Sequence, residues 1–208
     1  MIIFGIDPGT ATTGYGVIDT LVTTSNKQFQ LIEYGCIVTP KEQEMPMRLL
    51  SIQNDLHRLL KQHKPDCVSI EQLFFGVNSR TAMTVGQARG VVLSTVASYR
   101  IPIFEYQGLH VKHTITGSGK SDKKEIQKYV MRYLGKRKLE KPKVGYIDDA
   151  ADALAVAICH YIKVSNVSDV ENVSINRNTK VSNVSKVTKV SNIKKGAKVS
   201  KAKKKGRP

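Results

Sequence analysis

The feature that most constrains the fold is a short apolar run that ends in an acid. Residues 2–6 are IIFGI, and a nearly continuous apolar run is typical of a strand buried on both faces of a sheet. Asp7 follows at once, and Pro8 and Gly9 then break the strand. A carboxylate at the end of a buried strand costs free energy unless it is paired or binds a metal ion. Asp7 is therefore a candidate functional residue.

The chain from here to residue 163 alternates between strand and helix patterns. We expect further strands at 13–19, 29–38, 67–73 and 102–106, with 13–19 and 29–38 as antiparallel neighbours. Helices are expected at 47–63, 82–99, 122–134 and 149–162. Pro65 ends the first helix, and Asp122 with Glu125 forms an N-cap and capping-box pair that starts the third. This order predicts an α/β fold with a mixed sheet and helices on both faces.

The C-terminal part of the chain differs sharply in composition. Residues 164–208 contain 12 Lys+Arg against 2 Asp+Glu, whereas residues 1–163 contain 21 against 15. The segment KVSN recurs at 163, 180 and 189, and no helical or strand face is sustained. We expect one domain at residues 1–163, followed by a low-complexity basic tail at 164–208 that is disordered when alone. Such a tail can add affinity for a nucleic acid without regard to its sequence, or it can be an extension with no selected role.

Other features exclude several classes of protein. Cys36, Cys67 and Cys159 show no CxxC spacing, so we expect small buried hydrophobic residues rather than disulfides or a zinc site. The N-terminus lacks the charged region of a secretory signal, and no apolar run approaches the ~18 residues of a membrane span. These features predict a cytosolic protein without membrane contact.

Three more acids occur where a buried side chain is expected. Glu71 lies near the end of the strand 67–73, and if this strand lies parallel to the first, Glu71 and Asp7 emerge together at the edge where α/β sheets bind ligands. Asp149 and Asp152 are three residues apart on one face of the last helix. Asp148 points elsewhere. One acid at the start of a helix is ordinarily a cap, and this simpler interpretation applies to Asp148 or Asp149. The alanines around Asp152 would let this helix lie close to the sheet.

Gathering four carboxylates in one place creates strong repulsion between like charges. Bound cations would relieve it, and hard oxygen ligands suit Mg²⁺ or Mn²⁺. Two such ions about 3.5–4 Å apart can activate a water and stabilise the leaving oxygen of a phosphoryl displacement. The acids therefore predict a metal-dependent phosphodiesterase site.

Three blocks of the sequence resemble the signature blocks of the RuvC-type Holliday-junction endonucleases of bacteria. The blocks are GIDPGTATTGYGVI, IEQLFFGVNSRTAMTVGQARGV and DDAADALAVAICH, and the similarity runs from about residue 1 to 163. The resemblance implies a ribonuclease-H-like fold with a five-stranded mixed sheet, and a homodimer that resolves four-way DNA junctions in recombination and repair. It implies two symmetric nicks that leave 5′-phosphate and 3′-hydroxyl ends.

The resemblance also implies roles for particular residues. Two Mg²⁺ ions per subunit, replaceable by Mn²⁺, would be held by the catalytic residues Asp7, Glu71, Asp149 and Asp152. By the same resemblance, contacts to DNA would come from Phe74, with Phe75 beside it, and from Lys112 and Lys123. We expect further contacts from Arg80, Lys120 and Lys124. Further implications are a branch-migration motor of the RuvA and RuvB type as partner, and a place in the bacterial cytoplasm at the nucleoid.

Some of these assignments also rest on the residues themselves. Phe74 and Phe75 could be core residues, yet Gly76 and Asn78 indicate an exposed loop, where apolar side chains can wedge between bases. The four lysines could form a solvated face, but their grouping at a helix N-terminus favours a phosphate site. The helix 82–99 could form part of a dimer interface or lie wholly in the core.

Competing functions are less well supported by the sequence. GIDPGT also resembles the phosphate loop of sugar kinases and actin-like ATPases, but those folds need a second such domain. TITGSGKS, at 114–121, lacks the first glycine of a P-loop and does not follow a convincing strand. A related nuclease that processes ribosomal RNA, and a DNA-binding protein without activity, are the remaining alternatives.

Overall fold

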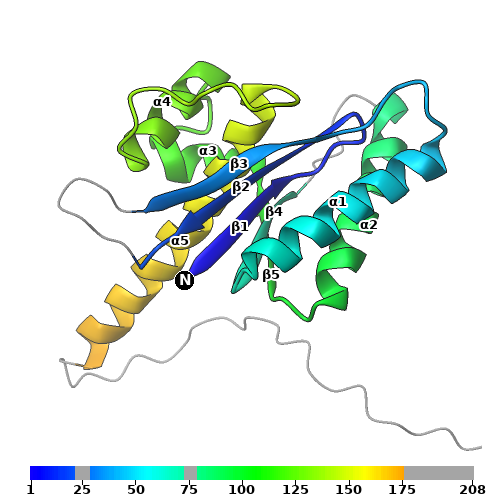
Figure 1. Cartoon of the computed structure of the whole chain (residues 1–208). Coiled ribbons are helices and arrows are strands. Elements are labelled where there is room, and N and C mark those ends of the chain that lie inside the picture. Colours follow the sequence, from blue (N-terminus) through cyan, green and yellow to red (C-terminus); the bar gives the residue numbers. More distant parts are fainter. Residues whose placement is uncertain (22–28, 73–78, 176–208) are drawn as a thin grey trace, which may run out of the picture.

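The protein has a central mixed sheet (Figure 1). The computed structural model describes residues 1–21, 29–72 and 79–175, with the backbone alone at 79–81 and 166–175. The strands are β1 (Ile2–Asp7), β2 (Thr12–Asp19), β3 (Gln30–Val38), β4 (Cys67–Gln72) and β5 (Ile103–Gln107), in the order β3-β2-β1-β4-β5. Pairing is antiparallel from β1 to β3 and parallel from β1 through β4 to β5. All the predicted strands, and the predicted mixed sheet, are confirmed.

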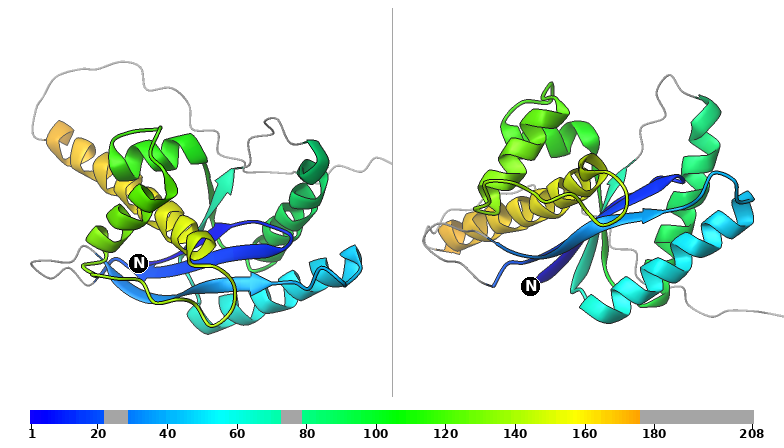
Figure 2. Two further views of the ribbon diagram at one scale, coloured as in Figure 1. Left: turned by 90° about the horizontal axis from the view of Figure 1, so that it is seen from above. Right: turned by 45° about the horizontal axis from the view of Figure 1, so that its top comes forward.

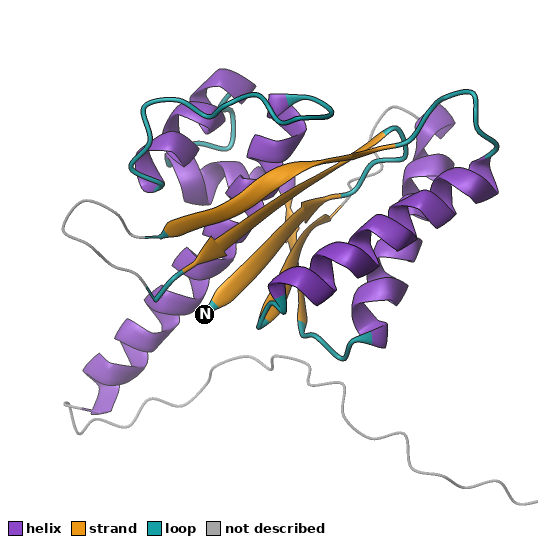
Figure 3. Ribbon diagram, in the orientation of Figure 1, coloured by secondary structure: helices purple, strands orange, loops and turns teal. Residues whose placement is uncertain are grey.

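Helices cover both faces of this sheet, as predicted (Figures 2 and 3). On one face lie α1 (Met45–His63) and α2 (Ser79–Ser98). On the other lie α3 (Gly108–Thr116), α4 (Lys123–Tyr133) and α5 (Ile147–Ile175). No described helix is long and apolar enough to cross a membrane.

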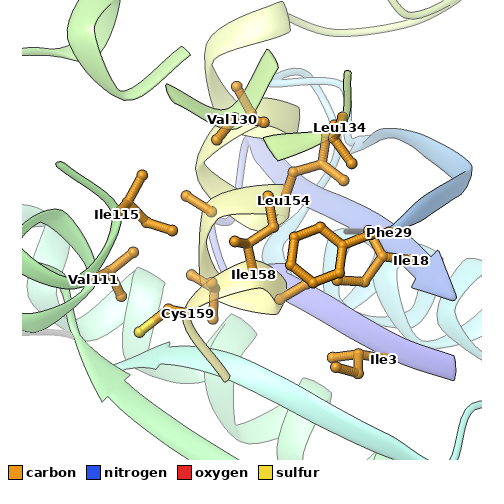
Figure 4. Close-up of a cluster of buried hydrophobic side chains, with 14 of the residues drawn as sticks. Ile3, Ile18, Phe29, Val111, Ile115, Val130, Leu134, Leu154, Ile158 and Cys159 are labelled. Atoms are coloured by element: carbon orange, nitrogen blue, oxygen red, sulfur yellow. The ribbon is translucent and has the colours of Figure 1, made fainter. Parts of the chain in front are cut away.

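Strand β1 is apolar throughout because it contributes to two cores. Ile3 packs in the core beneath α3, α4 and α5, part of which is shown in Figure 4. Phe4 and Ile6 point to the opposite face and pack in the core beneath α1 and α2. Successive side chains of a strand alternate between faces, so a central strand covered on both sides needs apolar residues at every position. Asp7 has the parity of Ile3 and therefore belongs to the α5 face.

The predicted helix boundaries are confirmed where capping chemistry marked them. Lys64 ends α1 in the left-handed conformation, with φ 44°, and Pro65 follows. Asp122 caps α4, and its side chain accepts a hydrogen bond from the backbone N–H of Glu125 at 2.8 Å.

Three predictions need correction. The helix α3 was missed, because only Val111 and Ile115 mark its buried face and its first residue is a glycine. The last helix does not end at residue 162 but continues to Ile175, since no Gly or Pro interrupts it. The first residues of the predicted tail are therefore helical, and residues 176–208 lie outside the described structure. Cys67 and Cys159 are buried as expected, whereas Cys36 is only partly buried.

Candidate active site

Asp7 and Glu71 lie side by side at the carboxyl ends of two parallel strands. The register pairs Ile6 of β1 with Ile70 of β4, so the residues that follow them are neighbours. Ile3 and Cys67, which are also paired, pack on the α5 face, and Asp7 and Glu71 lie four residues further on. Because faces alternate with period two, both carboxylates belong to the α5 face, as predicted.

Helix α5 reaches these strands because the sheet surface beneath it carries glycines. A Cβ atom added at Gly5 would lie 2.1 Å from the backbone oxygen of Ala153, and one added at Gly14 would lie 2.0 Å from that of Asp149. Gly14 pairs with Asp7 across the β1–β2 register. The start of α5 is thus pressed against the strand next to Asp7. The alanines of α5 predicted this close approach, but the glycines that complete it were missed.

Burial, and after it the charges of neighbouring acids, raise the pKa of all four carboxyls. Each is partly buried. Burial first, and then the charges of Glu71, Asp152 and Asp149, raise the pKa of Asp7 to about 8. Burial is also the main cause that raises the pKa of the other three carboxyls. Without added cations, the site therefore holds protons at a pH where exposed carboxylates hold none.

Lys123 is the cation that all four acids share. Its charge lowers the pKa of each of them, against the effect of burial. The Lys123 ammonium lies 3.9 Å from a carboxylate oxygen of Asp152. Lys123 is the first residue of α4, and its side chain is exposed. Its charge therefore offsets part of the negative charge of the acids, although its side chain is not buried among them.

A pocket of about 220 Å³ lies between the acids and two of the predicted DNA-binding lysines. Glu71 and Asp152 line it together with Lys112 and Lys123. Lys112 comes from the middle of α3, so the prediction that it lies at a helix N-terminus with the other lysines is wrong. Its charge nevertheless lowers the pKa of Glu71.

The remaining predicted DNA contacts fall into two groups. Lys120 and Lys124 are exposed, in the turn before α4 and in its first turn. Phe74 and Phe75 lie outside the described residues, and so does the side chain of Arg80. The segment 114–121 forms the end of α3 and the turn to α4, so it does not follow a strand as a P-loop must.

A second pocket, of about 360 Å³, opens beside the first. It is lined by Lys123, Lys141, Tyr146, Ile147, Asp148 and Asp149, and of these Lys141 and Tyr146 were missed. The run of basic residues that precedes Asp148 and Asp149 could have indicated them. Asp148 accepts a hydrogen bond from the amide of Gln127 at 2.7 Å. Asp148 is thus tied to α4, whereas Asp149 is among the charges that act on Asp7.

The chemistry of this donor set fits a hard divalent cation. Four carboxylates supply only oxygen ligands, and a pKa of about 8 at Asp7 indicates a site that lacks positive charge. Within the described ranges, no three His, Cys, Asp or Glu side chains converge as they would around one ion. Holding a cation would therefore require these side chains to rotate toward one another from their places around Lys123.

Comparisons with known proteins give the same picture. The family model described as "Crossover junction endodeoxyribonuclease RuvC" matches residues 3–160. A crossover junction endodeoxyribonuclease RuvC from Syntrophomonas wolfei is 49% identical over 160 residues, covering 77% of this chain and 88% of the relative.

Solved structures agree with the sequence matches. The Thermus thermophilus RuvC in complex with a Holliday junction substrate is 28% identical, with a TM-score of 0.70 over 81% of this chain and 97% of that one. The yeast mitochondrial Holliday junction resolvase Ydc2 shares the fold, at 12% identity, with a TM-score of 0.61 over 84% of this chain and 83% of that one. The expected ribonuclease-H-like fold is thus confirmed. The chain belongs to the RuvC family of crossover junction endodeoxyribonucleases, which are metal-dependent nucleases.

Proposed function

We propose that this protein resolves four-way DNA junctions by two symmetric nicks that leave 5′-phosphate and 3′-hydroxyl ends. The observation that carries the proposal is the gathering of acids from β1, β4 and α5 at one edge of the sheet. The Thermus relative whose structure contains a Holliday junction supports the choice of substrate.

Asp7, Glu71, Asp149 and Asp152 would hold two Mg²⁺ ions per protomer, with Mn²⁺ as a substitute. When bound, such ions activate a water and stabilise the leaving oxygen. Their grouping is otherwise unfavourable, because burial and then the charges of the other three acids raise the pKa of Asp7. Asp148 is not part of this set, since its carboxylate accepts from Gln127.

The lysines around the pocket would bind and orient the DNA. Lys112 and Lys123 line the same pocket as Glu71 and Asp152, so a phosphate at the acids would lie beside two ammonium groups. Lys120 and Lys124 are exposed near the start of α4 and would contact the backbone further away. Phe74, Phe75 and Arg80 would contact the centre of the junction.

The assembly follows from the symmetry of the substrate. A homodimer presents two active sites related by a two-fold axis, which suits two symmetric nicks in one junction. Helix α2 buries Ala88, Val92 and Val96 against the core, whereas Gly90 and Ser94 are exposed and available to a second protomer. A branch-migration motor of the RuvA and RuvB type would supply the junction, which places the protein in the cytoplasm at the nucleoid.

Cleavage of an end-labelled four-way junction, compared with linear duplex of the same sequence, tests the proposal. Paired symmetric nicks in the junction, with Mg²⁺ but not with EDTA, are expected. Equal cutting of the duplex, or cutting that survives EDTA, would contradict the proposed substrate or the proposed cation dependence. Structured RNA serves as a third substrate and should remain intact.

A further inference from the structure

The segment that connects α4 to α5 is strongly basic and is not used by the proposed mechanism. We call residues 135–146 the basic strap. Glu140 is its only acid, and all of its basic side chains are exposed: Lys136, Arg137, Lys138, Lys141 and Lys143. Among residues 1–21, 29–72 and 79–175, none of these side chains has an acidic partner within salt-bridge distance. The strap therefore presents unpaired positive charge to solvent.

The strap is held against the fold and does not hang free. Leu139 is 3% exposed and packs in the core beneath α5. The hydroxyl of Tyr34, on β3, donates to the backbone oxygen of Glu140 at 2.9 Å. The thiol of Cys36 donates to the backbone oxygen of Tyr146 at 3.3 Å. Figure 2 shows the strap, in yellow-green, on its way from α4 to α5. A backbone fixed in this way loses little conformational entropy when its side chains bind a ligand.

The end of the strap exposes an aromatic ring next to the acids. Gly145 turns the chain with φ 85°, and a Cβ atom there would lie 2.4 Å from that of Cys36. Tyr146 follows with 68% of its surface exposed, directly before the first turn of α5. An exposed aromatic ring among lysines is typical of a surface that stacks on bases or sugars and neutralises phosphates.

The pocket of about 360 Å³ joins the strap to the acids. Lys141 and Tyr146 line it together with Lys123 and Asp149. Lys123 also lines the pocket that contains Glu71 and Asp152, so the two pockets adjoin. A DNA strand that places one phosphate at the acids must place its next nucleotide close by, and this adjoining pocket offers that nucleotide a cation and an aromatic ring.

We propose that the basic strap is a second DNA-binding element, which holds the strand where it leaves the acids. Lys141 contacts the phosphate next to the scissile one, and the ring of Tyr146 packs on the adjacent sugar or base. This inference rests on the proposed function, because it requires DNA at the acids. It adds contacts that the predicted DNA-binding residues do not include.

The test compares full-length variants of the strap with a control lysine on the helix layer that covers the opposite face of the sheet. Lys141→Ala removes a phosphate contact, and Tyr146→Leu removes the ring, whereas Tyr146→Phe keeps the ring and removes only the hydroxyl. Lys61→Ala removes an exposed lysine near the C-terminus of α1, which covers the face of the sheet opposite to α5. Affinity for a fluorescent four-way junction is measured in EDTA at several salt concentrations, and cleavage is measured with Mg²⁺.

We expect Lys141→Ala to weaken binding several-fold and to reduce the salt slope by about one. Tyr146→Leu should weaken binding by roughly 5- to 100-fold, while Tyr146→Phe and Lys61→Ala bind as the parent does. Melting temperatures should be unchanged, because these side chains are exposed.

The inference is overturned if Lys141→Ala and Tyr146→Leu both bind and cleave like Lys61→Ala while the parent protein cleaves junctions. If the parent neither binds nor cleaves a junction, the proposed function fails and the inference falls with it. Loss of cleavage with unchanged affinity and salt slope would also overturn it, since the strap would then act on the acids and not on DNA.

Discussion

On the face of the sheet that meets α1 and α2, the central strands present large side chains such as Phe4, Ile6 and Ile70. Each of these side chains is at most 1% exposed. On the face that meets α5, the same strands present Gly5 and, at their ends, Asp7 and Glu71. The first face keeps its helices at the distance that bulky residues set. The second lets a helix approach closely, so that carboxylates from three elements lie at one edge of the sheet. One sheet thus uses one face for packing and the edge of the other for chemistry.

The largest change is expected where the acids themselves are altered. Asp7→Asn, or Asp152→Asn, should lower junction cleavage by ~10³-fold or more, because a lost ligand removes several kcal/mol of transition-state stabilisation. Affinity for the junction should persist, since the lysines remain. Single-turnover cleavage and anisotropy measure the two effects separately. Persistent cutting by both variants would remove these residues from the mechanism.

A substitution on the opposite face should show the reverse pattern. Phe4→Ala leaves a cavity beneath α1 and α2, where Phe4 is fully buried. The free energy of unfolding should fall by about 3–5 kcal/mol, as measured by urea denaturation. Cleavage per folded molecule should change little below the melting transition. A specific loss of cleavage in well-folded Phe4→Ala protein would show that the two faces are not independent.

Gly14→Ala tests the close approach of α5 directly. The added methyl would meet the backbone oxygen of Asp149 at 2.0 Å, so α5 must shift away from Asp7. We expect a loss of about 1–3 kcal/mol in stability, together with a marked loss of cleavage. Gly14→Ala protein with the parent's cleavage rate would contradict the positioning role of the glycines.

The smallest effect is expected from the C-terminal segment. Residues 176–208 carry 12 Lys+Arg and no Asp+Glu. Because α5 continues to Ile175, the chain should be shortened after that residue and not after Lys163. Truncation should weaken junction binding by roughly tenfold at moderate salt and flatten the salt dependence, without moving the cleavage positions. An unchanged affinity and salt slope would leave the segment without a role in DNA binding.

Much of this arrangement could be predicted from the sequence, because the strongest signals are local. Continuous apolar residues identified β1, and caps at Asp122 and Pro65 fixed helix boundaries. The parallel pairing of β1 with β4 could then be inferred, and with it the meeting of Asp7 and Glu71. The alanines around Asp152 indicated a helix that lies close to its partner.

What could not be predicted depends on contacts between distant segments. The fit of Gly14 beneath Asp149 needs the register of two strands and the position of a helix far along the chain. Asp148 and Asp149 are adjacent acids that look alike in the sequence. The hydrogen bond that Gln127 donates to Asp148 distinguishes their roles. The sequence of the basic strap is typical of an ordinary solvated loop. The hydrogen bonds from Tyr34 and Cys36 hold it against the fold, and these contacts could not be predicted.

The pKa of Asp7 connects the site to a measurement that does not depend on cleavage. Its folded-state pKa of about 8 exceeds the ordinary value of 3.8 for an aspartate, so in the absence of cations its contribution to stability is present below about pH 4. That contribution is lost as the pH rises through 8. A divalent cation binds the carboxylate form, so it should displace the proton and restore stability at the higher pH.

The most direct test of the cation site is proton release on addition of MgCl₂ at pH 7, measured by calorimetry in two buffers of different ionisation enthalpy. With Asp7 largely protonated at this pH, the parent protein should release up to about one proton per protomer as the ions bind. Asp7→Asn should release far less. Release that is absent from the parent, or equal in the two proteins, would contradict the claim that these acids form the metal site.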